Sequence, residues 1–192
     1  EGPVGLRELI PIVQEAGAAV MLRPTQGEHG TMFVLGRRRT IDDAVPSIIL
    51  AAEHYNMMVR MLEAGVDLAV RINLQTRYHE DETNGYNVLA EIPGVDPEVG
   101  DEVVLIGAHL DSWHSSPGGT DNADGSASTM EAMRILKAVG VQPRRTIRMA
   151  LWGGEEEGLL GARAWVNRHL AGEENRDAFE KFSVYFHNDP GY

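Results

Sequence analysis

Residues 101–113 read DEVVLIGAHLDSW, an apolar run that ends in a histidine and an aspartate. The run predicts a buried strand with His109 and Asp111 directly after it. Three further acidic motifs follow apolar, strand-like segments or the loop beyond one: Asp121–Gly125, Glu155-Glu156 and Asp189. An open, mostly parallel α/β sheet gathers the carboxyl ends of its strands along one edge, where ligands bind. We therefore expect the four motifs to meet in one crevice.

The composition is that of a globular protein without thiol chemistry. Of the 192 residues, 43% are hydrophobic and 24% are charged, as in an ordinary soluble domain. The formal charge of −12 argues against nucleic acid and anionic membranes as partners, because both select basic surfaces. Cysteine is absent, which excludes disulfides and thiolate ligands. No apolar run approaches the roughly 20 residues that a membrane-spanning helix needs.

The first part of the chain shows both helical and extended patterns. Helices are predicted over 6–16 and 52–63, and strands over 18–22, 32–35, 45–50 and 66–74. Composition then shifts at 76–84, which is polar and acidic and offers little that a core could bury. We therefore predict two domains, 1–78 and 79–192.

The second part alternates strands and helices, which is typical of an α/β sandwich. Strands are predicted over 86–92, 102–108, 146–152 and 182–188, and helices over 126–139 and 159–169. The first of these helices is expected to face the core with Ala127, Met130, Met133 and Leu136.

The side chains at the predicted crevice suit a metal ion. Imidazole and carboxylates without thiolates favour a hard-to-borderline divalent cation such as zinc. His109 is a candidate ligand through one ring nitrogen, with Asp111 as a carboxylate partner for the other. Asp121 is suited to bridge two ions because it has two oxygens. A lone histidine is more often a core residue, and Asp121–Gly125 also suits a helix cap. The presence of several carboxylates at the same predicted crevice nevertheless favours a metal site.

Glu155 and Glu156 follow an apolar strand and two glycines, so their side chains can point in different directions. One carboxylate can bind metal while the other accepts a proton from the attacking water molecule. An acidic run is usually a solvated surface, and Asp189 lies in an Asp-Pro-Gly sequence that is also an ordinary turn. A calcium loop is disfavoured because Ala123 occupies a ligand position, and other hydrolase motifs are absent. The sequence therefore predicts a hydrolase with two metal ions.

Three motifs follow one another along the chain: Gly107–Trp113, Asp121–Gly125 and Leu151–Gly158. Together they resemble the co-catalytic dizinc exopeptidases, the family of the bacterial zinc aminopeptidases and carboxypeptidase Q. The resemblance runs from about Tyr86 to Asp189, and the sequence around Leu110–Trp113 is most similar to that of the carboxypeptidase Q branch. It implies a three-layer α/β sandwich around a mixed, mostly parallel sheet. For 1–78 it implies part of a protease-associated, lid-like domain.

The resemblance also implies a role for each motif residue. His109 and Asp189 would bind one zinc ion, Glu156 the other, and Asp121 both. Glu155 would be the general base, and Asp111 would support His109.

The same resemblance implies a function: an exopeptidase that hydrolyses terminal peptide bonds, exported to the periplasm or secreted, with a homodimer as a possible assembly. The family takes a fifth ligand, a histidine, from a loop beyond the Asp189 position, and this chain ends at Tyr192. We therefore expect a chain truncated at both ends, with impaired activity.

Two other functional classes share this fold. One is a receptor-like binding protein without catalysis, which the intact Glu155-Glu156 pair argues against. The other is a one-zinc transferase of the glutaminyl cyclase kind, which zinc stoichiometry would separate from a two-zinc peptidase.

Overall fold

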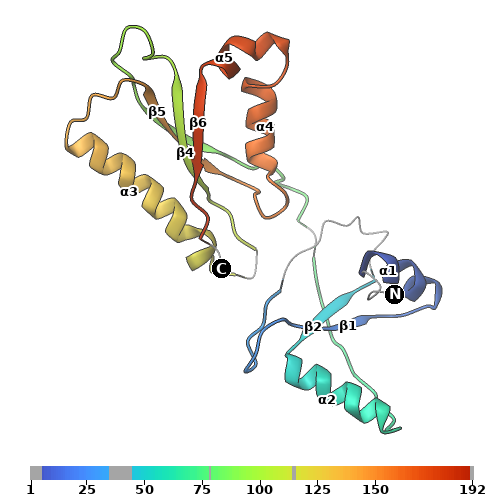
Figure 1. The fold of residues 1–192 in the computed structure, drawn as a ribbon. Coiled ribbons are helices and arrows are strands. Elements are labelled where there is room, and N and C mark those ends of the chain that lie inside the picture. The colour runs from blue at the N-terminus through green and yellow to red at the C-terminus, as the bar shows by residue number, and fades with distance from the viewer. Residues whose placement is uncertain (1–5, 35–44, 78, 114–115, 191–192) are drawn as a thin grey trace. The chain divides into compact units, whose positions relative to one another are not determined.

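The computed structural model describes residues 6–34, 45–77, 79–113 and 116–190. The chain divides into two compact units, Glu1–Tyr78 (unit 1) and His79–Tyr192 (unit 2), as Figure 1 shows. None of the helices in the described residues combines the length and apolarity that a membrane crossing needs.

Unit 1 contains two parallel strands and two helices. Helix α1 (Leu6–Glu15) precedes β1 (Met21–Pro24), and β2 (Ser47–Leu50) leads into α2 (Ala52–Glu63). The strands pair directly, from Met21 opposite Ser47 to Pro24 opposite Leu50. Helix α2 contacts β1.

Two predicted strands of unit 1 are wrong. Residues 31–34 and 66–74 are not paired as strands, and Leu35 lies outside the described residues. Within the second segment, Val70 and Leu74 are 52% and 58% exposed. Alternating side chains favour extended backbone, but a strand also needs a neighbouring strand to pair its N–H and C=O groups. The alternation therefore reported local conformation alone.

Unit 2 is built on a four-stranded sheet in the order β3-β5-β4-β6. The strands are β3 (Val88–Ile92), β4 (Val103–His109), β5 (Thr146–Trp152) and β6 (Phe182–His187). Strands β5, β4 and β6 are parallel, and β3 is antiparallel to β5. This confirms the predicted mixed, mostly parallel sheet.

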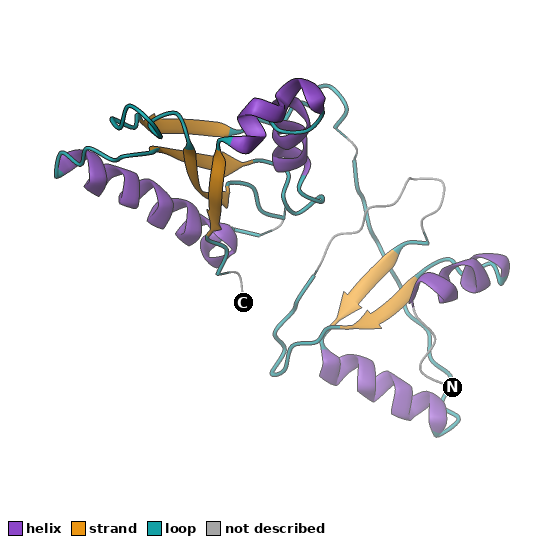
Figure 2. Ribbon diagram, turned by 45° about the horizontal axis from the view of Figure 1, so that its top comes forward, coloured by secondary structure: helices purple, strands orange, loops and turns teal. Residues whose placement is uncertain are grey.

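Helices cover both faces of this sheet, as Figure 2 shows. Helix α3 (Gly125–Ala138) lies on one face and follows a short segment, η2 (Gly119–Asp124), whose backbone departs from helical geometry at Asp121 and Asn122. Helix α4 (Leu160–His169) covers the other face, and two short segments, η3 (Glu173–Asn175) and α5 (Arg176–Glu180), lead into β6. The result is the predicted three-layer α/β sandwich.

Alternate residues of β4 and β5 pack into two separate core layers, because successive side chains of a strand point to opposite faces. The layer under α3 contains Ala108, Met133, Met149 and Leu151. The layer under α4 contains Leu105, Ala150, Trp152 and Trp165.

The buried face of α3 differs from the prediction. Met133 is buried and Leu136 packs against the core, as predicted. Met130 is 52% exposed and Ala127 is exposed, whereas Ser126 and Thr129 are buried in their place. The Ser126 hydroxyl donates a 2.7 Å hydrogen bond to the carbonyl oxygen of His109. Small polar residues therefore take the inner positions at the start of α3, where the helix closes on the end of β4.

Candidate metal centre

His109 is the last residue of β4, an interior strand of the sheet, and is 1% exposed. Its Nδ1 lies 2.9 Å from the carbonyl oxygen of Asp111, which can only accept a hydrogen bond. In the neutral ring Nδ1 therefore carries the proton and Nε2 keeps a free lone pair. A histidine that binds metal through Nε2 needs this tautomer.

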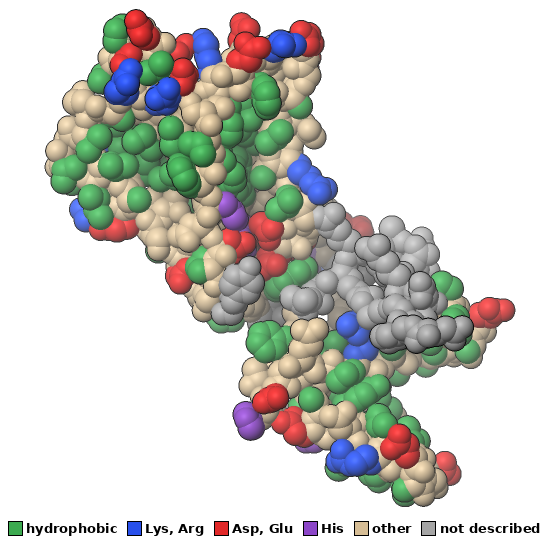
Figure 3. Space-filling view, in the orientation of Figure 1, with side chains coloured by type: hydrophobic (Ala, Val, Ile, Leu, Met, Phe, Trp, Pro, Cys, Tyr) green, Lys and Arg blue, Asp and Glu red, His purple; other side chains and the backbone are tan. Residues whose placement is uncertain are grey.

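Two carboxylates from distant parts of the chain converge on Nε2 of His109. Asp121 lies in η2 and Asp189 follows β6; their Oδ1 atoms are 2.8 and 3.5 Å from Nε2. One donor atom from each of the three residues lies within 4.8 Å of the others. Figure 3 shows acidic side chains gathered with an exposed histidine on the visible face of unit 2, whereas His109 itself is 1% exposed. The structure thus brings together three of the predicted ligands.

These residues fit a metal ion by their unsatisfied chemistry. Nε2 of His109 is buried and has no hydrogen-bond partner among the described residues, although Asp121 lies near it. A buried polar atom without a partner is costly and calls for an explanation. A cation held between one imidazole and two carboxylates would satisfy all three, and this donor set suits zinc.

The turn that carries Glu155 and Glu156 is anchored by Asp111. The backbone N–H of Glu155 donates to Asp111 Oδ1 at 2.9 Å, and that of Glu156 donates to Oδ2 at 3.2 Å. Gly154 permits this turn with a φ of 66°, in the left-handed region. Both glutamate side chains are thereby set at the carboxyl end of β5.

Asp111 meets His109 through a different group from the one that we predicted. Its carboxylate is 3.7 Å from Nδ1 of His109, beyond hydrogen-bond distance, whereas its carbonyl oxygen is 2.9 Å away. The carboxylate is occupied by the two N–H groups of the glutamate turn. Asp111 therefore ties the end of β4 to the end of β5.

The acidic side chains of the cluster repel one another electrostatically. Burial, together with the neighbouring Asp121 carboxylate, raises the pKa of Glu156 to about 7. Burial also raises the pKa of Glu155. Burial opposes protonation of His109, but the charge of Asp189 and the hydrogen bond to Asp111 outweigh it and raise the pKa. A cation would relieve this excess of negative charge.

Glu156 falls outside the group of three donor atoms, so the structure does not by itself define a second ion. It also shows residues that the sequence reading did not assign to the site. Asn122 is 1% exposed and donates a 3.0 Å hydrogen bond to the carbonyl oxygen of Asn188, which joins the Asp121 turn to the end of β6. The position of Asn122 beside Asp121 was the only available signal.

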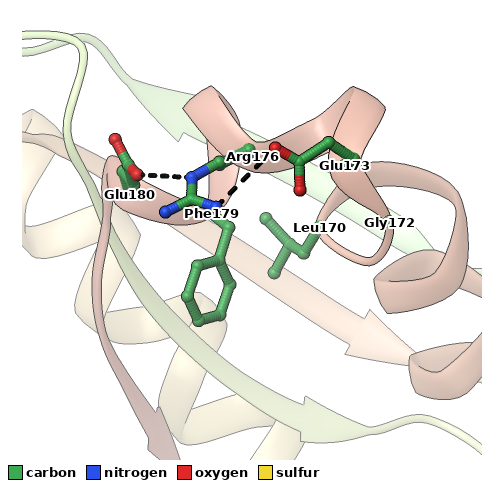
Figure 4. Close-up of a pocket in the computed structure, with 6 residues that line it drawn as sticks. All are labelled: Leu170, Gly172, Glu173, Arg176, Phe179 and Glu180. Atoms are coloured by element: carbon green, nitrogen blue, oxygen red, sulfur yellow. Dashed lines mark hydrogen bonds and ion pairs between the residues drawn. The ribbon is translucent and has the colours of Figure 1, made fainter.

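A separate pocket of about 390 Å³ lies beside α5 and contains none of the predicted site residues (Figure 4). Leu170 and Phe179 form its apolar wall. Arg176 forms ion pairs with Glu180 at 3.0 Å and with Glu173 at 3.7 Å. Its positive charge is therefore balanced by residues that also line the pocket. Because α5 leads into the amino end of β6, the pocket lies away from the carboxyl-edge cluster.

Comparison with known proteins identifies the family. The model of "Peptidase family M28" matches residues 87–189, more than half of the chain. The chain belongs to peptidase family M28. The matched segment runs from just before β3 to Asp189 and so includes every motif residue of the cluster.

This M28 chain is similar to several known proteins. Carboxypeptidase Q of Mus musculus is 33% identical over 148 residues, which cover 77% of this chain and 29% of that protein. The crystal structure of a peptidase M28 precursor from Shewanella amazonensis is 28% identical with a TM-score of 0.67, over 91% of this chain and 38% of that one. A zinc aminopeptidase from Bacillus subtilis, 21% identical, shares the fold with a TM-score of 0.60 over 99% of this chain and 42% of that one. The chain thus spans less than a third of the mouse relative.

We expect zinc binding by this M28 chain to tighten as the pH rises through the neutral range. Glu156, with a pKa of about 7, and His109, with a raised pKa, each hold a proton that a metal must displace. Chelator competition at a series of pH values measures this dependence. A zinc affinity independent of pH would contradict the protonation that we assign to the metal-free cluster.

The same two groups should make the zinc-free fold less stable as the pH rises. Both folded pKa values lie above the ordinary values of 4.5 and 6.5, so the folded state holds more protons than the unfolded state in this range. The contribution of Glu156 to the stability of the folded state is therefore complete below pH 4.5, and it is lost as the pH rises through about 7. Thermal unfolding of the zinc-free protein, with Glu156→Gln for comparison, measures this loss.

Proposed function

We propose that this M28 chain carries the metal centre of a zinc-dependent exopeptidase that hydrolyses a terminal peptide bond. The observation that carries the proposal is the convergence of the Asp121 and Asp189 carboxylates on Nε2 of His109, a buried ring nitrogen that faces them with a lone pair and makes no hydrogen bond within the described part of the chain. The name of carboxypeptidase Q, to which the chain is similar, describes an enzyme that acts at the end of a peptide chain. Peptides with a free terminus are therefore the proposed substrates.

The resemblance to the dizinc exopeptidases implies how the ligands would divide between two zinc ions. His109 and Asp189 would hold one ion and Glu156 the other, with Asp121 shared between them. The influence of Asp121 on the pKa of Glu156 supports a place for Glu156 in the same charge cluster. When bound, zinc activates water as a nucleophile and polarises the carbonyl group under attack.

Glu155 is the proposed general base. Burial raises the pKa of its carboxylate, which makes it a better proton acceptor than an exposed glutamate. The hydrogen bond from its N–H to Asp111 holds its backbone at the carboxyl end of β5, beside the cluster. Glu155 would take the proton from the attacking water molecule and pass it to the leaving amine.

Metal analysis combined with peptide hydrolysis tests this function. We expect bound zinc and cleavage of peptides with one free terminus, and no cleavage of peptides blocked at both ends. Peptides blocked at one end only would show which terminus is recognised. Cleavage inside doubly blocked peptides would contradict the exopeptidase assignment, and absence of zinc binding would contradict the metal centre.

We expect Asp111→Asn to reduce kcat/KM by about 10–100-fold, the usual effect of losing a contact that orients a metal site. The amide would keep one acceptor oxygen but would present an NH2 group to the backbone N–H of either Glu155 or Glu156, so the glutamate turn would lose one of its two acceptors. Steady-state kinetics on zinc-loaded protein measures the loss. Asp124→Asn is the matched control because Asp124 is exposed and lies in the same unit. An equal loss in both variants would refute the anchoring role.

A further inference from the structure

A line of hydrogen bonds lies behind Asp189 on the α4 side of the sheet. Nε1 of Trp152, at the end of β5, lies 2.7 Å from the hydroxyl oxygen of Tyr185. That hydroxyl lies 2.6 Å from Nδ1 of His187, two residues further along β6. Neither Tyr185 nor His187 has a role in the metal centre described above.

Gly107 makes this contact possible. Strand β4 lies between β5 and β6, so Trp152 and Tyr185 must meet across it. A Cβ atom at Gly107 would lie 2.9 Å from the Tyr185 hydroxyl oxygen and 3.1 Å from its ring. The missing side chain therefore leaves the space through which the two residues touch.

The donors and acceptors along the line set the proton position on His187. A tryptophan N–H can only donate, so the Tyr185 oxygen accepts from Trp152. The single proton of the hydroxyl is then directed at Nδ1 of His187, and burial raises the pKa of Tyr185, so the phenol keeps it. A neutral imidazole that accepts at Nδ1 carries its own proton on Nε2.

Nε2 of His187 faces the metal cluster. It lies 3.6 Å from Oδ2 of Asp189, while Oδ1 of the same carboxylate lies 3.5 Å from Nε2 of His109. The two oxygens of Asp189 are thus divided between the cluster and His187. At 3.6 Å this contact is longer than a hydrogen bond, so the Nε2–H group of His187 acts on Oδ2 as a dipole aimed at the carboxylate. Outer contacts of this kind orient carboxylates that bind metal.

We propose that Trp152, Tyr185 and His187 form a positioning relay that presents an N–H group to Oδ2 of Asp189 and so aims Oδ1 at the metal. The proposal rests on the proposed zinc centre for its purpose. The tautomer of His187 does not depend on zinc and is measured separately.

The first measurement is the tautomer of His187 in the zinc-free protein. NMR shifts of the two ring nitrogens, in mildly alkaline buffer where imidazole is neutral, should show the proton on Nε2. Tyr185→Phe should weaken this preference, and Tyr86→Phe, which removes a hydroxyl from a 73% exposed ring in the same unit, should leave it unchanged. A proton on Nδ1 in the unmodified protein would overturn the relay.

The second measurement is zinc affinity by chelator competition. Tyr185→Phe and His187→Leu should weaken it by about 10–100-fold, whereas His187→Gln, which can place an amide N–H near the Nε2 position, should restore most of the loss. Thermal unfolding of each variant checks that the fold is retained. Zinc binding that is unchanged in Tyr185→Phe overturns the relay alone. If the unmodified protein binds no zinc, the proposed metal centre is wrong and the relay loses its role with it.

Discussion

Glu155→Gln should lower kcat by about 10²–10⁴-fold, the usual contribution of a positioned general base. Glutamine has nearly the same shape as glutamate but cannot take up a proton. The backbone N–H that anchors residue 155 to Asp111 is unaffected by the change. The zinc content should therefore stay at the level of the unmodified protein, and the loss should fall on the chemical step.

The matched control is Glu157→Gln, two residues away in the same acidic run and exposed. It should leave both kcat and zinc content unchanged. Kinetics on zinc-loaded protein, with metal analysis of each sample, separates a lost base from a lost ligand. Full activity in Glu155→Gln would show that another group moves the proton.

His109→Ala should weaken zinc binding by more than about 100-fold. Loss of an outer contact to a metal ligand already costs about 10–100-fold, and His109 supplies the imidazole on which Asp121 and Asp189 converge. Addition of zinc should raise the unfolding temperature of the unmodified protein, because a ligand that binds only the folded state stabilises it. Added zinc should not raise the unfolding temperature of His109→Ala.

His109 is buried, so its removal also leaves a cavity. Asp121→Asn tests the same centre without a change of volume and should also lose zinc affinity. His79→Ala is the control for a histidine outside the cluster, because His79 is exposed. If His109→Ala and Asp121→Asn bind zinc as tightly as His79→Ala, the cluster is not the metal centre.

The strand predictions that succeeded belong to segments whose pattern extends over the whole element. The apolar runs at 102–108 and 146–152 became β4 and β5, the strands that make the two core layers. The alternation at 66–74 was also a local strand signal, but no strand among the described residues pairs with it. Periodicity measures a local preference, and pairing depends on a distant segment.

The inner face of α3 shows the same limit. Apolar spacing pointed to Met130, but the helix turns Ser126 and Thr129 inward, because its first turn contacts the end of β4. A pattern that counts only apolar residues overlooks a small polar residue whose partner is a backbone carbonyl group. The error lies where α3 begins beside His109, a candidate metal ligand, and sequence patterns are least reliable at such positions.

The motif residues could be named from the sequence because the carboxyl ends of parallel strands share one edge, whatever the details of packing. The atoms through which these residues contact one another could not be predicted from the sequence. Only the tertiary structure shows that Asp111 holds the glutamate turn by its carboxylate and His109 by its carbonyl oxygen. Only the strand order β3-β5-β4-β6 and the space above Gly107 bring Trp152 to Tyr185. Hydrophobic patterns record which face of an element is buried, whereas contacts across a sheet depend on strand order and on the volume of the residues between.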